Sequence, residues 1–573
     1  MFRHVITQTL VLVVLALGAI EAQTKAGDPV IPAKKESVSQ KKAREKREQQ
    51  RLEQLTAKID SLIGAEESAR AFWGIEIVSL DTGKTLYAHN ANNLFTPASN
   101  AKLTSAISAL RLLGPEYRER TTIESDAHID ARGRLAGNLM FVGRGDPNIS
   151  SRVLPYHLKT ERPAPHLRIL EAMADEMVKQ GLKMVEGNIV GDDSFFSNER
   201  YPSGWAQDDL MWEYGAPVSA LTINDNEVFL NILPGSAAGD KAYLHFEPET
   251  EYFQIENRIV TSAAGTKRDV SIDRAPGSHE LVLWGNTPLD DKGMNESLAV
   301  DDPALFAAQQ LRSMLIKRGV TVTGNAVAHH KSLADIAEGK PAAPATLPVA
   351  NNATVQPPVP PSSAGAAPVS DAPEKSAQNT SIDPNRTVFF TRESEPLIID
   401  TAVTLKISQN LHAELMLRLV GREKGTDTSL DAALETVRTV LTEAGLTKEE
   451  YNFNDGSGLS RGDLVSPHAI VKLLTFANSQ PWADSFRASL PVAGVDGSLS
   501  ERMKGTAAES RVTAKTGTLG HVNALSGYFT STSGEHFVFS IFCNNHKLTS
   551  RGATTIMDKI MEAVVEDKAE EKK

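Results

Sequence analysis

Residues 96–113 read TPASNAKLTSAISALRLL. Apolar residues recur in this stretch at helical spacing and Gly114 follows as a C-terminal cap, so we predict a helix from about Ser99 to Leu113. Ser99 and Lys102 are three residues apart and therefore lie on one face of that helix. A serine hydroxyl becomes a nucleophile when a base accepts its proton, and a lysine can be that base where burial and nearby cations lower its pKa.

The same spacing also occurs where it carries no chemistry. Ser39 and Lys42 are three residues apart within a charged, solvated run. Taken alone, Ser99 and Lys102 are better explained as an N-cap serine and a surface lysine. Their interpretation therefore depends on what else the chain contains.

A second motif, Ser408–Gln409–Asn410, lies between two segments with helical patterns, Pro396–Lys406 and His412–Gly421. A hydroxyl beside a carboxamide offers a proton relay and a donor–acceptor clamp for a substrate amide. The alternative explanation is a loop serine followed by an N-capping asparagine.

A third motif is Lys515–Thr516–Gly517, followed by Thr518. Val512–Ala514 precedes it and predicts the edge of a sheet, where an extended peptide substrate can pair with the backbone. The cation and the hydroxyl suit a terminal carboxylate, and we expect Gly517 to let the substrate approach closely.

The 573 residues have room for about three or four domains. Residues 72–90 predict two strands around a turn. Residues 120–300 consist of short strand-like runs, interrupted by one helix at about 166–180. We therefore expect one or two β-rich accessory domains at 120–300, inserted into a catalytic domain formed by 65–119 and 301–573. Within the latter, residues 340–384 hold ten of the chain's 29 prolines and no aromatic residue, which predicts a disordered insertion.

The amino terminus is typical of an exported protein. Arg3 precedes an apolar run that is strongest from Leu10 to Leu17 and is followed by small residues, which predicts a signal peptide over residues 1–22. Residues 23–64 then read as a charged helical linker with one thin apolar stripe, and Gly64 is a plausible cap. The stripe consists of Leu52, Leu55, Ile59 and Leu62. We expect a periplasmic or otherwise extracytoplasmic location.

Composition and charge exclude several classes of partner and site. The formal net charge of −12 argues against a nucleic-acid partner, because phosphate contacts need clustered Lys and Arg. Cys543 is the single cysteine, which excludes a disulfide framework and a cysteine metal cluster. The chain has no His-Glu-x-x-His motif, so we expect no metal and no cofactor. The sequence allows both a monomer and a homo-oligomer.

The order Ser-x-x-Lys, Ser-x-Asn, Lys-Thr-Gly resembles that of penicillin-binding proteins and β-lactamases. The chain as a whole resembles the class C low-molecular-mass penicillin-binding proteins, the D-alanyl-D-alanine carboxypeptidase/endopeptidases of the penicillin-binding protein 4 type. The resemblance covers about residues 68–335 and 388–565. It includes five further segments: Val142–Pro147, Gly191–Phe195, Ala216–Asn226, Asp455–Ser460 and Gly494–Leu499. Arg144 stands where glycine is usual, and Gln409 replaces the commoner aspartate.

The resemblance implies an α/β (α+β) catalytic domain in which helices flank an antiparallel sheet on both faces. The 309 positions from Ser99 to Ser408 exceed the spacing of a compact β-lactamase, and the insertion accounts for the excess. The implied activity is a serine-type D-Ala-D-Ala carboxypeptidase with DD-endopeptidase activity on peptidoglycan stem peptides, with β-lactams as covalent inhibitors. A β-lactamase and a cell-wall binding protein with a vestigial site are the alternatives.

The resemblance also implies roles for individual residues. Ser99 is the expected nucleophile and Lys102 its general base. Ser408 is expected to relay the proton and Asn410 to hold the acyl side chain. Lys515 and Thr516 are expected to bind the terminal carboxylate, and the backbone N–H groups of Ser99 and Thr518 to form the oxyanion hole. We expect activity to survive the presence of Gln409.

Overall fold

The computed structural model describes residues 38–157, 162–339 and 385–567. The predicted signal peptide, the Pro-rich segment 340–384 and residues 23–37 of the charged linker lie outside these residues.

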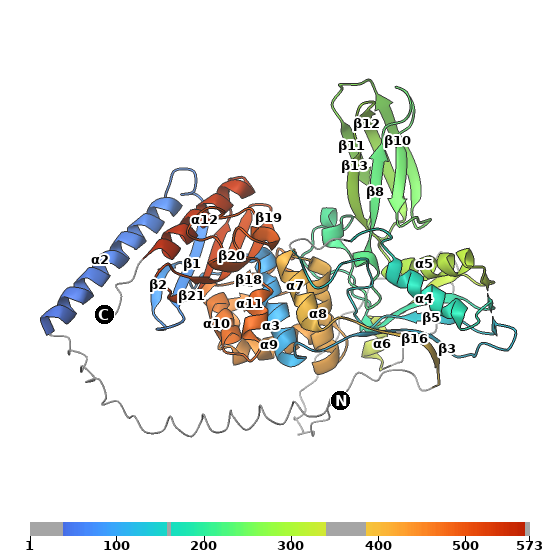
Figure 1. Cartoon of the computed structure of the whole chain (residues 1–573), viewed down its shortest axis with the longest axis horizontal. Coiled ribbons are helices and arrows are strands. Elements are labelled where there is room, and N and C mark those ends of the chain that lie inside the picture. The colour runs from blue at the N-terminus through green and yellow to red at the C-terminus, as the bar shows by residue number, and fades with distance from the viewer. Residues whose placement is uncertain (1–37, 158–161, 340–384, 568–573) are drawn as a thin grey trace, which may run out of the picture. The chain divides into compact units, whose positions relative to one another are not determined.

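A five-stranded antiparallel sheet joins the two ends of the chain (Figure 1). Its strand order is β19-β20-β21-β1-β2, so β19 lies at one edge. The five strands are β1 (Phe72–Ser79), β2 (Thr85–His89), β19 (Val512–Leu519), β20 (Val522–Thr530) and β21 (His536–Asn544). The two strands predicted at 72–90 and the edge strand predicted at Val512–Ala514 are thereby confirmed.

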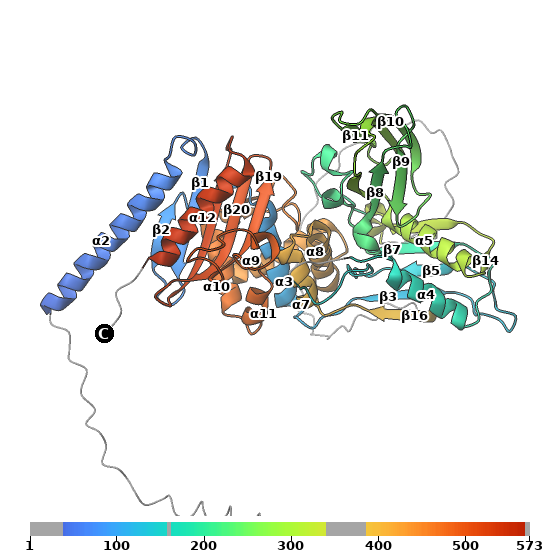
Figure 2. The same ribbon diagram turned by 45° about the horizontal axis from the view of Figure 1, so that its top comes forward.

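Side chains along the sheet alternate between two hydrophobic clusters, as the two-residue period of a strand requires. In β20, Ala524 and Tyr528 belong to the cluster on one face, whereas Leu525 and Phe529 belong to the other. The first face is covered by helices that include α3 and α10, and the second by α12 (Figure 2). The predicted antiparallel sheet with helices on both faces is confirmed.

The helices around this sheet come from both ends of the chain. They are α2 (Val38–Ile63), α3 (Lys102–Leu112), α7 (Leu397–Lys406), α8 (Asn410–Lys424), α9 (Leu430–Glu443), α10 (Pro467–Asn478), α11 (Ala483–Ala488) and α12 (Ser550–Glu566). A short hairpin, β17 (Tyr451–Asn452) and β18 (Leu464–Val465), joins α9 to α10.

Only the end of α2 is buried. Leu55, Ile59 and Ile63 belong to the same hydrophobic cluster as β1 and α12, whereas Leu52 and Leu62 are half-buried. The predicted apolar stripe is thus confirmed at Leu55 and Ile59, whereas Ile63 rather than Leu62 is its last buried residue. The Gly64 N–H donates to the Asp60 carbonyl at 2.9 Å, in agreement with the predicted cap.

A second five-stranded sheet, of order β15-β7-β5-β3-β16, forms the centre of the insertion. It is mixed, because β7 runs parallel to β15 and β5, while β3 runs antiparallel to β5 and β16. The strands are β3 (Arg120–Ser125), β5 (Leu139–Val142), β7 (Ile189–Ser197), β15 (Ala326–Lys331) and β16 (Thr387–Glu393). A small sheet of β4 (Arg134–Leu135), β6 (Met184–Val185) and β14 (Thr321–Val322) lies in the same region.

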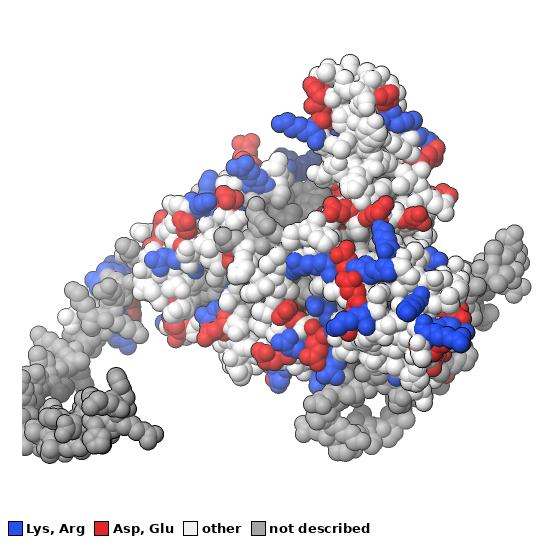
Figure 3. All heavy atoms as spheres, turned by 45° about the vertical axis from the view of Figure 1, so that its right-hand side comes forward, with Lys and Arg blue, Asp and Glu red and all other residues white. Residues whose placement is uncertain are grey.

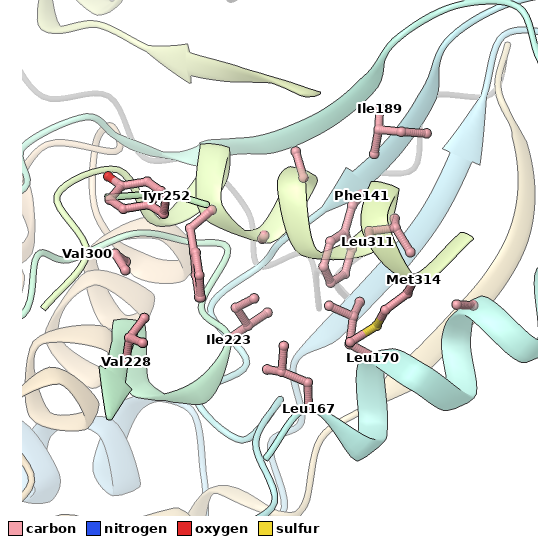
Figure 4. Close-up of a cluster of buried hydrophobic side chains, with 14 of the residues drawn as sticks. Phe141, Leu167, Leu170, Ile189, Ile223, Val228, Tyr252, Val300, Leu311 and Met314 are labelled. Carbon is pink, nitrogen blue, oxygen red and sulfur yellow. The ribbon is translucent and has the colours of Figure 1, made fainter. Parts of the chain in front are cut away.

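The core of the insertion lies between this sheet and two helices, α4 (Arg168–Lys179) and α5 (Pro303–Lys317). Figure 4 shows Phe141 of β5 among Leu170 of α4, Leu311 and Met314 of α5. α4 confirms the helix predicted at about 166–180. The unusual Arg144 is buried and donates to Thr122 and Glu124 of β3, at 2.7 and 2.9 Å, so its charge is paired.

The predicted domain boundary at residue 300 is wrong. α5, α6 (Leu333–Ala337) and β15 follow residue 300, yet β15 pairs along β7 and α5 contributes to the core of the insertion. β16, which comes after the Pro-rich segment, pairs with β3. These pairings join residues far apart in the sequence, so the segments 303–331 and 387–393 belong structurally with the insertion.

Two three-stranded sheets complete the insertion and form a finger, green in Figure 1. One consists of β8 (Glu227–Leu233), β9 (Tyr243–Glu247) and β13 (Met294–Ala299), and the other of β10 (Gln254–Ser262), β11 (Asp269–Asp273) and β12 (Glu280–Pro288). On the face drawn in Figure 3, basic and acidic side chains are interspersed rather than gathered by sign. Among the residues that the structure describes, no helix is both long and apolar enough to span a membrane.

We predict that Ile59→Ala lowers the melting temperature. Ile59 is fully buried between α2 and the central sheet, and truncating such a side chain costs about 2–5 kcal/mol. The exposed neighbour Lys58 provides the control, because Lys58→Ala removes no buried surface. Calorimetric melting of the three proteins tests this, and equal melting temperatures for wild type and Ile59→Ala would contradict the packing of Leu55–Ile63 on the central sheet.

Candidate active site

Ser99 lies in a 3₁₀ turn, Ala98–Ala101, rather than in the α-helix predicted to begin there. The helix α3 begins at Lys102. Ala98 has a φ of +47°, a left-handed conformation that is unfavourable for a residue with a side chain. The left-handed Ala98 opens the 3₁₀ turn, and Ser99 in that turn lies just before the start of α3.

Lys102 connects this turn to two other segments. Its fully buried Nζ lies 2.9 Å from Ser99 Oγ, 2.6 Å from Asn410 Oδ1 and 2.7 Å from the Ser457 carbonyl. The structure thereby confirms the predicted proximity of Ser99 and Lys102. Three oxygens surround the amine, and one of them is the candidate nucleophile.

Burial lowers the pKa of Lys102 to about 7, against the opposing effect of the nearby Asp455 and Glu414 carboxyls. Removing a charged group from water disfavours its charged form, so near neutral pH a large fraction of Lys102 is an uncharged amine. An uncharged amine has a lone pair and can accept the proton of a hydroxyl. Lys102 therefore has the lowered pKa that a lysine needs in order to act as a base.

Ser408 precedes helix α8, with a φ of +65°. Its Oγ accepts a hydrogen bond of 2.8 Å from Lys515 Nζ. Asn410, the first residue of α8, accepts from Lys102 through Oδ1 and donates through Nδ2 to the Tyr214 carbonyl at 2.7 Å. Both polar atoms of the Asn410 amide are thus engaged, so holding a substrate as predicted would require one of these bonds to be exchanged.

Lys515 lies on the edge strand β19 and is fully buried. Besides Ser408 it donates to the Thr516 carbonyl at 2.8 Å. Burial, together with the positive charge of Lys102, holds the pKa of Lys515 well below its usual value. Thr516 is half-buried, and its Oγ1 lies 2.7 Å from Ser498 Oγ.

Gly517 also serves packing within the protein, and its role in letting a substrate approach stays a prediction. A Cβ on Gly517 would lie 2.8 Å from the Pro97 carbonyl oxygen, so the missing side chain lets β19 lie against the turn of Ser99. Gly458 also packs closely against the turn of Ser99, because a Cβ on Gly458 would lie 1.9 Å from the Ala98 carbonyl oxygen. The Thr518 side chain is exposed at the same edge.

Neither Asp455–Ser460 nor Glu414 has a role predicted from the sequence. Glu414 Oε1 accepts from the backbone N–H groups of Gly456 and Ser457, at 2.9 and 2.8 Å, which fixes the carbonyl that contacts Lys102. Burial and the nearby Asp455 raise the pKa of Glu414 to about 8. Glu414 is four residues after Asn410 on a helix, so it lies on the same face as Asn410, and this spacing is the one sequence signal that places it near the site.

The three motifs therefore meet. Lys102 contacts Asn410, Lys515 contacts Ser408, and Asn100 Nδ2 donates to the Lys515 carbonyl at 3.4 Å. Two hydroxyls and two amines of lowered pKa lie together beside the edge strand β19. This set can carry out acyl transfer through a serine ester. Within the described parts of the chain, no group of three or more His, Cys, Asp or Glu side chains is arranged to hold a metal ion.

Comparison with known proteins identifies the family. The model of the D-Ala-D-Ala carboxypeptidase 3 (S13) family matches residues 55–340 and 376–565. This chain belongs to that family. It is 33% identical over 507 residues to the D-alanyl-D-alanine carboxypeptidase of Actinomadura sp. (strain R39), which covers 87% of this chain and 82% of the relative. It is 23% identical over 475 residues to D-alanyl-D-alanine carboxypeptidase DacB of Haemophilus influenzae, covering 82% and 84% of the two chains.

The fold is shared with a solved member of the group. The crystal structure of penicillin binding protein 4 from Haemophilus influenzae superimposes with a TM-score of 0.68 at 20% identity, covering 90% of this chain and 98% of that one. The S13 chain described here is thus a serine-type D-Ala-D-Ala carboxypeptidase with the penicillin-binding protein 4 fold.

We predict that the rate of acylation by a β-lactam rises with pH, with a midpoint near 7. Below the pKa of Lys102 the ammonium has no lone pair to accept the Ser99 proton, and above it the free amine does. Stopped-flow measurement of acylation between pH 5.5 and 9 tests this. A rate that stays constant from pH 6 to 8.5 would rule out an amine of lowered pKa as the base.

Proposed function

We propose that this S13 carboxypeptidase uses Ser99 as its nucleophile. Ser99 Oγ attacks the carbonyl carbon of the penultimate D-alanine of a stem peptide, and its proton passes to Lys102 Nζ. The single observation that carries this assignment is the 2.9 Å contact between these two atoms, at an amine whose pKa burial lowers to about 7. The backbone N–H groups of Ser99 and Thr518 would hold the oxyanion, a contribution of about 3–4 kcal/mol per donor in other enzymes.

Collapse of the tetrahedral intermediate breaks the bond to the terminal D-alanine. Ser408 would pass its hydroxyl proton to the leaving amine and take one back from Lys515 Nζ, while Lys102 keeps the proton of Ser99 and an ester remains on Ser99. Water would then hydrolyse this ester: its oxygen bonds to the acyl carbon, Lys102 returns a proton to Ser99 Oγ, and the proton released by the water restores Lys515 through Ser408. Ser408 Oγ lies 2.8 Å from Lys515 Nζ, which can orient the hydroxyl for that transfer. We assign Asn410 to holding Lys102, because its Oδ1 already accepts from that amine at 2.6 Å.

The terminal carboxylate of the substrate would bind at Lys515 and Thr516. An arriving carboxylate favours the charged form of Lys515, whose pKa burial and Lys102 otherwise depress. Binding of the anion would thus restore the positive charge that holds it. The same site accommodates the carboxylate of a β-lactam, and a structure of the Haemophilus influenzae penicillin binding protein 4 is complexed with one.

We also propose DD-endopeptidase activity. The bond in a cross-link follows a D-alanine, as does the bond in a free stem peptide, so the same chemistry serves both. β19 lies at the sheet edge, where an extended peptide can pair. Because peptidoglycan lies outside the cytoplasm, we propose an extracytoplasmic location, in keeping with the predicted signal peptide.

Ser99→Ala should abolish labelling by fluorescent penicillin and lower D-alanine release by about 10³-fold or more, because no other hydroxyl replaces the nucleophile. Ser39→Ala is the matched control: Ser39 has the same spacing to a lysine but lies exposed on α2. Gel fluorescence and a D-alanine assay on a pentapeptide give the readouts. Labelling of Ser99→Ala at the wild-type level would refute the assignment.

Digestion of purified muropeptides separates the two activities. We expect uncross-linked pentapeptides to lose one D-alanine, and DD-cross-linked dimers to become monomers, with products identified by mass. Loss of D-alanine without cleavage of dimers would refute the endopeptidase proposal alone. Rapid turnover of a chromogenic cephalosporin would instead favour a β-lactamase, and penicillin labelling without any peptide cleavage would favour a vestigial site.

A further inference from the structure

The turn that carries Ser408 adopts a conformation that its own sequence does not favour. Ser408 is not a glycine, yet its φ of +65° lies in the left-handed region. Such a residue persists only where surrounding contacts determine its conformation. The contacts that hold the next residue, Gln409, therefore matter for the position of the Ser408 hydroxyl.

Gln409 makes two side-chain hydrogen bonds in opposite directions. Its Oε1 accepts from the Leu411 N–H at 2.8 Å and so caps the start of α8. Its Nε2 donates to Asp225 Oδ2 at 3.1 Å. Asp225 belongs to the insertion, so Gln409 links a residue of the second motif directly to a different part of the fold.

Asp225 is buried in a turn that is held in place by hydrogen bonds. It is 1% exposed and lies in a run, Asn224–Asn226, in which all three residues have a φ between +49° and +57°. Asn224 Nδ2 donates to the Glu227 carbonyl at 2.8 Å, and Asn226 Nδ2 donates to the Pro217 carbonyl at 3.0 Å. Three consecutive left-handed residues without glycine mark a turn that its surroundings hold in place.

The charge of Asp225 is also fixed. Arg152 donates to Oδ2, and an Arg162 guanidinium nitrogen lies 3.5 Å from the same oxygen. His412 Nε2, one helical turn after Gln409, lies 3.6 Å from Oδ1, and His412 Nδ1 contacts Asp400 of α7 at 2.7 Å. These cations hold the pKa of the Asp225 carboxyl well below its usual value despite its burial, so it stays an acceptor for the Gln409 amide.

We propose that Gln409 is a positioning residue for Ser408, and that it transmits the fixed position of Asp225 in the insertion to the active site. The insertion contacts the start of α8 through Asp225 at Gln409 and through the Tyr214 carbonyl at Asn410. The inserted domains thus set the geometry of the second motif. Glutamine suits this task because one end of its amide accepts for the cap while the other donates to Asp225. This inference rests on the proposed role of Ser408.

The variant Gln409→Glu tests the link. It keeps the length and the capping oxygen but places a carboxylate oxygen beside Asp225 in place of the donor. We expect the first-order acylation rate constant with a β-lactam to fall at least 10-fold, with little change in the apparent dissociation constant of the preceding complex. Gln310→Glu is the matched control, since Gln310 is a buried glutamine of α5 whose bond is to the Glu249 carbonyl.

A double-mutant cycle shows whether Gln409 acts through Ser408. If it does, Gln409→Glu in a Ser408→Ala background slows acylation by less than 2-fold, because the group being positioned is already gone. An equal slowing in both backgrounds would overturn the proposal, as would a wild-type acylation rate in Gln409→Glu or an effect confined to the dissociation constant. If Gln409→Glu does not fold, the nearly isosteric Gln409→Met removes the same link without adding charge and must give the same pattern.

The proposed function fails in a different way. If Ser99→Ala is still labelled, or wild type is not acylated, the nucleophile assignment is wrong whatever Gln409 does. If wild type is acylated at Ser99 and the Gln409 variants behave like wild type, the positioning proposal alone is overturned.

Discussion

Two lysine side chains are buried in the candidate active site, and this burial constrains the structure around them. Lys102 and Lys515 are both fully buried, and the charge of the first lowers the pKa of the second. Burying an ammonium group is unfavourable unless nearby oxygens compensate it or it loses its proton. Lys102 meets both conditions, because three oxygens lie within 2.9 Å of its Nζ and its pKa is near neutral. The proposed mechanism uses the uncharged form of Lys102 that burial favours.

Backbone segments must approach unusually closely to supply those oxygens. Gly458 brings the Ser457 carbonyl against the turn of Ser99, and Gly517 brings β19 against the same turn. Ala98 and Ser408 adopt left-handed conformations beside the two hydroxyls. Left-handed residues and close packing are therefore concentrated where the candidate catalytic groups meet, and the antiparallel sheet with its two hydrophobic clusters supports this region.

Local patterns were sufficient to predict much of the catalytic part. Apolar periodicity found α3, α4 and the strand pair at 72–90, and the three motifs found the five polar groups that the structure brings together. The predicted boundary at residue 300 failed because β15 and β16 join the insertion by pairing with β7 and β3, which no local pattern reveals. The close contact of Gly517 with Pro97 could not be predicted either, because the two residues are more than 400 positions apart in the sequence. Glu414 and Gln409 act through backbone groups and a distant carboxylate, so residue type alone gave them no role.

Measuring the protonation state of Lys102 in the resting enzyme is the most direct test of a lysine base. With lysine carrying ¹³C at Cε, a titration by nuclear magnetic resonance follows each amine, and the Lys102→Arg variant identifies the signal of Lys102. We expect this signal to titrate with a pKa near 7, several units below the ordinary value of an exposed lysine. A signal that titrates near 10 would contradict it, because the amine would then be charged at neutral pH and could not accept the serine proton.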